Sequence, residues 1–111
     1  MSKSTLEASL LQQIKWAGLP APQVEYRAIP ERRFLWDGAY PEIGLLYEIQ
    51  GGIWHKGGHS TGTGITRDCE KNNLAVQRGW RVLYFRAEMV GSGDALAMIE
   101  KELGRGMDGE K

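Results

Sequence analysis

The chain has 111 residues, and its 14 basic side chains balance 14 acidic ones, so its formal net charge is zero. With 41% hydrophobic and 25% charged residues it has the composition of an ordinary soluble domain, and no apolar run is long enough for a membrane span. A lone cysteine, Cys69, excludes an intramolecular disulfide and is typical of a reducing cytoplasm. We therefore expect one cytoplasmic domain over residues 1–104, followed by a disordered tail over 105–111.

The first predicted element is a helix that begins with a capping box. Ser4 and Glu7 have the spacing of an N-cap residue and its partner three positions later. The helix is expected to continue to about Ala17 and to end at Gly18. Its apolar side chains recur at helical spacing on one side, at Leu6, Leu10, Leu11 and Ile14.

Three strands are predicted next. The first, over residues 23–29, is bounded by prolines and is expected at an edge of the sheet. Two apolar runs, 33–40 and 45–50, flank the turn sequence of residues 41–44, which predicts a hairpin. In the second run alternate side chains point to opposite faces of the sheet. One face carries Leu45, Tyr47 and Ile49, and the other carries Leu46, Glu48 and Gln50.

The second half of the chain predicts a helix, a strand and a helix after a glycine-rich loop over residues 51–64. The helix runs from Thr66 to Arg78, the strand covers 80–85, and the last helix covers about 94–103. A helix that leads to a strand in the same sheet gives a parallel strand pair. The order α-β-β-β-α-β-α predicts an α/β fold with a mixed central sheet flanked by helices.

Asp37 and Glu48 fall on the two strands of the hairpin, where backbone pairing is expected to bring them together. Two carboxylates can give one divalent cation two hard oxygen ligands, and the backbone carbonyl of Ile49 could supply a third. Alternatively, Asp37 ends its strand and Glu48 is its solvated cross-strand partner. Two like charges then repel each other, a cost that a bound cation would remove.

The pattern of Asp37 followed by Glu48-Ile49-Gln50 resembles the PD-(D/E)xK nuclease superfamily, which has the restriction-endonuclease-like fold. Later segments follow in an order similar to very-short-patch repair endonucleases and to small phage nucleases allied with archaeal-type Holliday junction resolvases. These segments are 51–55, 67–72 and 79–83. The resemblance covers about residues 4–103 and implies hydrolysis of DNA phosphodiester bonds with Mg²⁺ or Mn²⁺ held by Asp37 and Glu48.

The same resemblance suggests four further catalytic residues, each with an alternative. Gln50 stands where the family usually has a lysine, and it can position a water molecule but carries no charge. Lys71, on the next helix, is the candidate replacement for that charge, or else a solvated lysine. Glu7 matches an acidic residue on the first helix of resolvase-like relatives, or only caps the helix. His55 matches a histidine that takes part in acid–base chemistry in the very-short-patch enzymes.

The net charge of zero is evidence against DNA binding, because phosphate neutralisation usually leaves a basic footprint. A basic face can nevertheless coexist with acidic residues elsewhere on the surface. The alternative is ordinary solvated surface charge. The predicted DNA-binding residues are Arg32, Arg33, Lys56, Arg67 and Lys71.

A small chain without a separate recognition domain favours the recognition of DNA shape. We therefore expect cleavage of branched or distorted duplex DNA, as by a Holliday junction resolvase. Two symmetric cuts at a two-fold junction predict a homodimer. The alternatives are a mismatch or nicking endonuclease of the very-short-patch type and a non-catalytic DNA-binding module with the same fold, which Gln50 permits.

Overall fold

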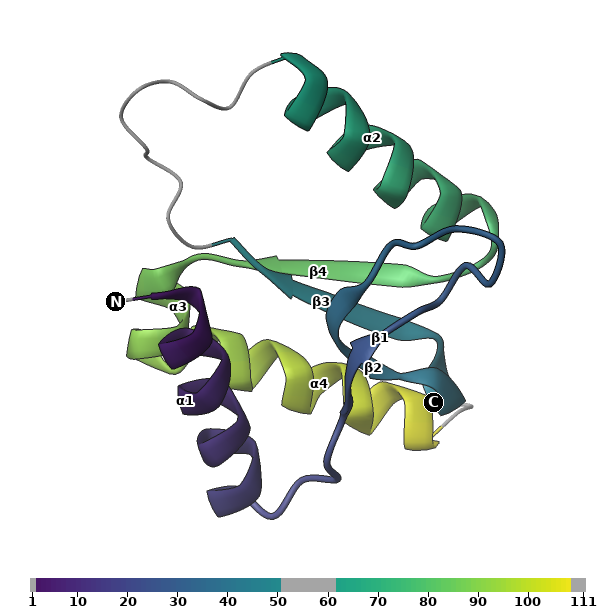
Figure 1. Ribbon diagram of the computed structural model, residues 1–111. Coiled ribbons are helices and arrows are strands. Elements are labelled where there is room, and N and C mark those ends of the chain that lie inside the picture. Colours follow the sequence, from purple (N-terminus) through teal and green to yellow (C-terminus); the bar gives the residue numbers. More distant parts are fainter. Residues whose placement is uncertain (1, 51–61, 109–111) are drawn as a thin grey trace.

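A four-stranded mixed sheet lies at the centre of the computed structural model, which describes residues 2–50 and 62–108 (Figure 1). The strands are β1 (Gln23–Tyr26), β2 (Trp36–Tyr40), β3 (Leu45–Ile49) and β4 (Arg81–Phe85), in this spatial order. The pairs β1–β2 and β2–β3 are antiparallel, and β3–β4 is parallel. The predicted hairpin, the edge position of the first strand and the parallel crossover are therefore confirmed.

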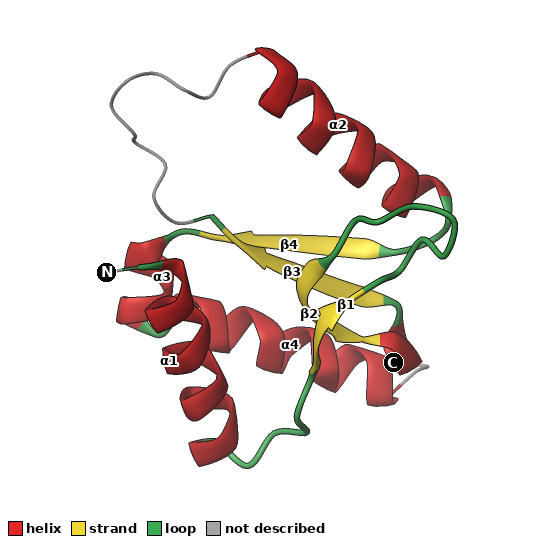
Figure 2. Ribbon diagram, in the orientation of Figure 1, coloured by secondary structure: helices red, strands yellow, loops and turns green. Residues whose placement is uncertain are grey.

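Helices cover both faces of this sheet (Figure 2). One face carries α1 (Lys3–Trp16), α3 (Ala87–Ser92) and α4 (Asp94–Asp108), and the other faces α2 (Gly62–Gln77). This arrangement confirms the predicted α/β class with a mixed sheet flanked by helices. The short helix α3, which connects β4 to α4, was not predicted.

Each face of the sheet has its own hydrophobic core. Leu46 packs on the α2 side with Trp36 and Ala75, and all three are fully buried. The residues on either side of Leu46 instead face α1, α3 and α4. The predicted core face of the second hairpin strand is therefore confirmed for Leu45, Tyr47 and Ile49.

A short 3₁₀ helix, η1 (Pro41–Ile43), and Gly44 form the turn between β2 and β3. Gly44 has a φ angle of 67°, in the left-handed region that glycine adopts without a steric cost. Its carbonyl accepts a hydrogen bond from the amide of Arg81 at 2.8 Å, which ties the turn to the start of β4. The turn sets the hairpin register, with the pairs Tyr40–Leu45, Ala39–Leu46 and Gly38–Tyr47.

The start of α1 differs from the prediction. Its N-cap is Ser2, whose hydroxyl accepts a hydrogen bond from the amide of Thr5 at 3.1 Å. The predicted capping box of Ser4 and Glu7 is therefore wrong. Because Glu7 does not serve the helix end, its side chain is available for contacts with the sheet.

Other boundaries also differ, and β2 begins at Trp36 rather than at residue 33. β1 ends at Tyr26 rather than at residue 29, because Ile29 turns into the core on the α2 side. α2 begins at Gly62, earlier than the predicted cap at Thr66, and α4 continues past Gly104 to Asp108. The helix thus includes the first part of the predicted disordered tail. None of the described helices is long and apolar enough to span a membrane.

Candidate functional site

Asp37 and Glu48 lie at the end of the β2–β3 pair, next to the last paired residues of the ladder, Gly38 and Tyr47. Beyond this pair the Asp37 side chain continues the pairing, since its Oδ2 accepts a hydrogen bond from the amide of Ile49 at 2.7 Å. The bond fixes the Asp37 carboxylate beside the end of β3. Glu48, the residue before Ile49, is held at the same end of the sheet.

An ammonium group from α1 lies among three carboxylates at this position. Lys3 Nζ is 3.2 Å from Asp37 Oδ1, 3.9 Å from Glu48 Oε2 and 4.0 Å from Glu7 Oε2. The Asp37 and Glu48 side chains are only 12% and 16% exposed, whereas that of Lys3 is 43% exposed. We call Glu7, Asp37 and Glu48 the carboxylate cluster, and the structure brings all three around one positive charge.

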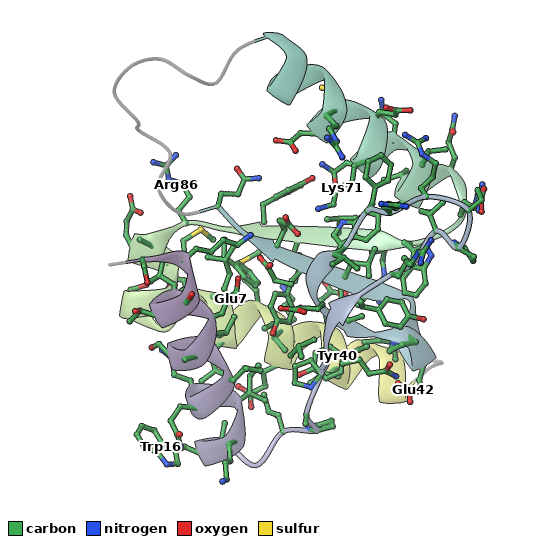
Figure 3. The ribbon with its side chains drawn as sticks, viewed as in Figure 1. Glu7, Trp16, Tyr40, Glu42, Lys71 and Arg86 are labelled. Carbon is green, nitrogen blue, oxygen red and sulfur yellow. The ribbon has the colours of Figure 1, made fainter. Side chains whose placement is uncertain are left out.

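Lys71 reaches the carboxylate cluster from α2, on the other side of the sheet from Glu7 (Figure 3). Its Nζ donates hydrogen bonds to Glu48 Oε2 at 3.1 Å and to the carbonyl of Leu35 at 2.7 Å. It also lies 4.8 Å from the centre of the Trp36 ring, a favourable cation–π contact. With its side chain 13% exposed, Lys71 is not a solvated surface lysine.

Burial and mutual repulsion raise the pKa of two groups in the carboxylate cluster. For Glu48, burial is the main cause, and the negative charge of Asp37 adds to it, while Lys71 and Lys3 act in the opposite direction. For Glu7, burial again comes first, followed by the charge of Asp37 and a hydrogen bond to it. Ionising Glu7 and Glu48 beside the charge of Asp37 is therefore unfavourable without further positive charge.

Replacing Glu7 by glutamine should stabilise the metal-free protein at neutral pH. The folded-state pKa of Glu7 lies above its ordinary value of 4.5, so as the pH rises past 4.5 the unfolded chain loses a proton that the native state retains. The contribution of Glu7 to the free energy of unfolding therefore falls as the pH rises through this window. Glu7→Gln removes this unfavourable contribution, because glutamine does not ionise. Urea denaturation should show a higher free energy of unfolding for the variant at pH 7 and a smaller gain at pH 4.

Glu100→Gln is the control for this measurement, because Glu100 is an exposed glutamate on α4. It should leave the pH dependence of unfolding unchanged. A Glu7→Gln protein no more stable than the wild type at pH 7 would contradict the electrostatic account of the carboxylate cluster.

The donor chemistry of the cluster fits a hard divalent cation. Asp37 Oδ1 and Glu48 Oε2 already share a cation, the Lys3 ammonium, and Glu48 Oε1 is buried without a hydrogen-bond partner. A buried, unpaired carboxylate oxygen costs free energy that a ligand contact would recover. Mg²⁺ binds commonly through one or two carboxylates and keeps several water ligands. The carboxylates of Asp37 and Glu48 therefore provide as many protein ligands as a Mg²⁺ ion commonly has.

The described residues hold no preformed cage of three or more His, Cys, Asp and Glu side chains with metal-site spacing. Glu7 therefore does not complete a three-carboxylate site in the present arrangement. The carbonyl of Ile49 as a further metal ligand stays a prediction. The same residue has a structural role that the sequence did not indicate, because its amide holds Asp37 in place.

The remaining predicted catalytic residues are less closely tied to the cluster. Gln50 directly follows β3, is exposed, and donates its backbone amide to the carbonyl of Phe85 at 2.7 Å. This bond fixes its backbone two residues beyond Glu48, while a role for its side chain stays a prediction. His55, together with the predicted DNA-binding residue Lys56, lies outside the described residues.

The predicted DNA-binding residues that are described do not form one uniform basic surface. Arg32 forms an ion pair with Glu70 at 2.8 Å. Lys71 forms an ion pair with Glu48 of the carboxylate cluster. Arg33 and Arg67 are exposed, as a phosphate contact requires. Neutralisation by neighbouring glutamates thus reduces the basic character that the sequence suggested.

Two residues at the site were not identified from the sequence. Lys3 has the i, i+4 spacing to Glu7 that places two side chains on one side of a helix, and this was the available signal. Tyr84 is the parallel partner of Glu48 in β4. Burial first, and then the charge of Glu48, raise the pKa of Tyr84, and a hydrogen bond with Asn72 opposes them.

Comparison with known proteins returns no relative. No model of a known protein family matches the chain, and no curated protein or solved structure matches it. Fold and site together define an α/β domain with a mixed four-stranded sheet and a lysine-bridged carboxylate cluster at one end of a hairpin.

Proposed function

We propose that the protein is a metal-dependent DNA endonuclease with a restriction-endonuclease-like core, in which Asp37 and Glu48 hold Mg²⁺ or Mn²⁺. The observation that carries this proposal is the meeting of these carboxylates, from two paired strands, at 3.2 Å and 3.9 Å from one ammonium nitrogen. The order of helices and strands supports it, because it is the order that the sequence resemblance implies.

When bound, the metal ion would polarise a phosphate oxygen and lower the pKa of a coordinated water. The residues of the chain position the other components. The Ile49 amide orients Asp37, and Lys71 supplies a positive charge beside Glu48. Gln50, directly after β3, can hydrogen-bond a water molecule without adding charge.

The family usually has a lysine at the position of Gln50, and in this chain Lys71 supplies that positive charge instead. Its ammonium is 3.1 Å from Glu48 Oε2 and is fixed by the Leu35 carbonyl, so the charge is held at the site although it comes from a helix. A preorganised positive charge stabilises the negative charge that develops on a phosphate during hydrolysis. We assign Lys71 this role.

Lys71→Met should therefore reduce kcat for DNA cleavage by about 10²-fold, the size expected when one preorganised charge stabiliser is lost. Methionine keeps much of the aliphatic stem that packs beside Trp36. Lys101→Met, at an exposed lysine of α4, is the control and should cleave like the wild type. Equal activity of both variants, with unchanged urea denaturation, would remove Lys71 from the mechanism.

We propose branched DNA as the substrate, cut by a homodimer. The test compares a four-way junction, a mismatched duplex and a perfect duplex of the same length, each with Mg²⁺ or Mn²⁺. Paired symmetric nicks across the junction, together with a dimeric mass in light scattering, would support the proposal.

The other outcomes of this test are also decisive. Preferred nicking of the mismatched duplex would favour the very-short-patch type of enzyme. A gel shift of the junction with every substrate left intact would overturn the endonuclease proposal in favour of a DNA-binding module.

A further inference from the structure

Lys3 occupies the position between Asp37 and Glu48 at which a shared cation would sit. Its Nζ is within 4.0 Å of one oxygen from each member of the carboxylate cluster. The ammonium therefore neutralises the same oxygens that the proposed function assigns to a metal.

The location of Lys3 in α1 supports a role beyond helix formation. Lys3 is the first residue of the helix, directly after the N-cap Ser2, and the first turn contains no acidic residue. A cation is unfavourable at this end, because the helix dipole places partial positive charge there. The ion pairs with the carboxylate cluster offset this unfavourable interaction with the helix dipole. They therefore stabilise Lys3 at the start of α1.

Lys3 can also leave the cluster when another cation replaces it. Its side chain is 43% exposed, in contrast to Lys71 at 13%. Its ion pairs are with the three acids, and the pair with Asp37 includes a side-chain hydrogen bond. Water can replace the protein contacts of a partly exposed ammonium, provided that another cation then neutralises the poorly exposed carboxylates of Asp37 and Glu48. The two lysines thus differ, one being fixed in the site and the other displaceable.

We propose that Lys3 is a tethered competitor of the divalent cation, which holds the carboxylate cluster together in the metal-free state and is displaced when the metal binds. The inference rests on the proposed metal site. It implies that the site binds a divalent cation more weakly with Lys3 present than it would without the competing ammonium. Two cations cannot occupy the space between Asp37 and Glu48 without strong repulsion.

The test is a titration of the DNA-free protein with Mn²⁺, in which electron paramagnetic resonance measures the free ion. Lys3→Met should lower the Mn²⁺ dissociation constant by about fivefold or more, the size expected when a partly exposed ion pair no longer competes. Lys3→Arg keeps the charge and should bind Mn²⁺ nearly as the wild type does.

Lys15→Met is the matched control, because it removes one positive charge from the exposed last turn of the same helix. Its Mn²⁺ dissociation constant should stay unchanged, which separates local competition from an effect of net charge. Asp37→Asn should abolish the binding that Lys3→Met strengthens, which locates the ion at the cluster.

An Mn²⁺ affinity of Lys3→Met equal to or weaker than that of the wild type would overturn the proposal, and so would the absence of Mn²⁺ binding in both proteins. Because no DNA is present, this result is independent of cleavage. Stronger Mn²⁺ binding by Lys3→Met in a protein that cuts none of the DNA substrates would support the competition and reject only the endonuclease function.

Discussion

Asp37→Asn is expected to eliminate cleavage of the four-way junction. Loss of a carboxylate that we propose as a metal ligand should reduce kcat by at least about 10³-fold, which corresponds to about 4 kcal/mol of transition-state stabilisation. Asparagine retains a side-chain oxygen that can accept the hydrogen bond from the Ile49 amide, so the end of the hairpin should stay folded. The measurement is single-turnover cleavage with Mg²⁺ at a saturating protein concentration.

Glu48→Gln should show a comparable loss, because it removes the other proposed metal ligand. Glu100→Gln, at an exposed glutamate of α4, should cut the junction at the wild-type rate. Urea denaturation of all three variants tests whether they fold. If Asp37→Asn is folded and cuts as fast as the wild type, the carboxylate cluster is not the catalytic site.

Gly38→Ala should be the most destabilising single-methyl addition among the described glycines. A Cβ atom at this position would lie 2.2 Å from Cζ of the Tyr47 ring, far inside van der Waals contact. Tyr47 is only 2% exposed and packs against Phe85 with ring centres 5.8 Å apart, so the ring has no free space to move into. We expect a loss of about 3 kcal/mol in the free energy of unfolding, the upper part of the range for overpacked cores.

Gly91→Ala provides the comparison for this result. Gly91 lies in helix α3, and a Cβ atom there would meet nothing within 4 Å. Alanine should increase stability by about 0.5–1 kcal/mol, because it has the higher helix propensity. Urea denaturation measures both variants, and similar free energies of unfolding for the two would contradict the packing observed around Gly38.

The sequence was sufficient to predict the fold class because its strongest patterns are local. Alternation along residues 45–49 and the glycine turn at Gly44 determine the hairpin without reference to the rest of the chain. Helix α3 was missed because six residues that include Gly91 and Ser92 give too short and too weak a helical pattern. The cap of α1 was misplaced because Ser2 and Ser4 both offer a suitable hydroxyl, and only the folded backbone selects Ser2.

The site was predictable where backbone pairing alone sets the distance. Asp37 and Glu48 belong to one hairpin, so their proximity follows from its register. The position of Lys3 depends instead on how α1 packs against the sheet, a tertiary contact that no local pattern specifies. The contact between Lys71 and Glu48 likewise depends on the angle at which α2 crosses the sheet, and the sequence offered Lys71 only as a candidate through the family resemblance.

The hydrogen bond from the Ile49 amide to Asp37 has a consequence for the cooperativity of the molecule. Asp37 therefore both completes the end of the β2–β3 strand pair and belongs to the carboxylate cluster. Fraying of the last residues of β3 would release the Asp37 carboxylate and separate it from Glu48 in the same event. The site and the end of the sheet therefore form one unit, which is assembled or lost in a single step.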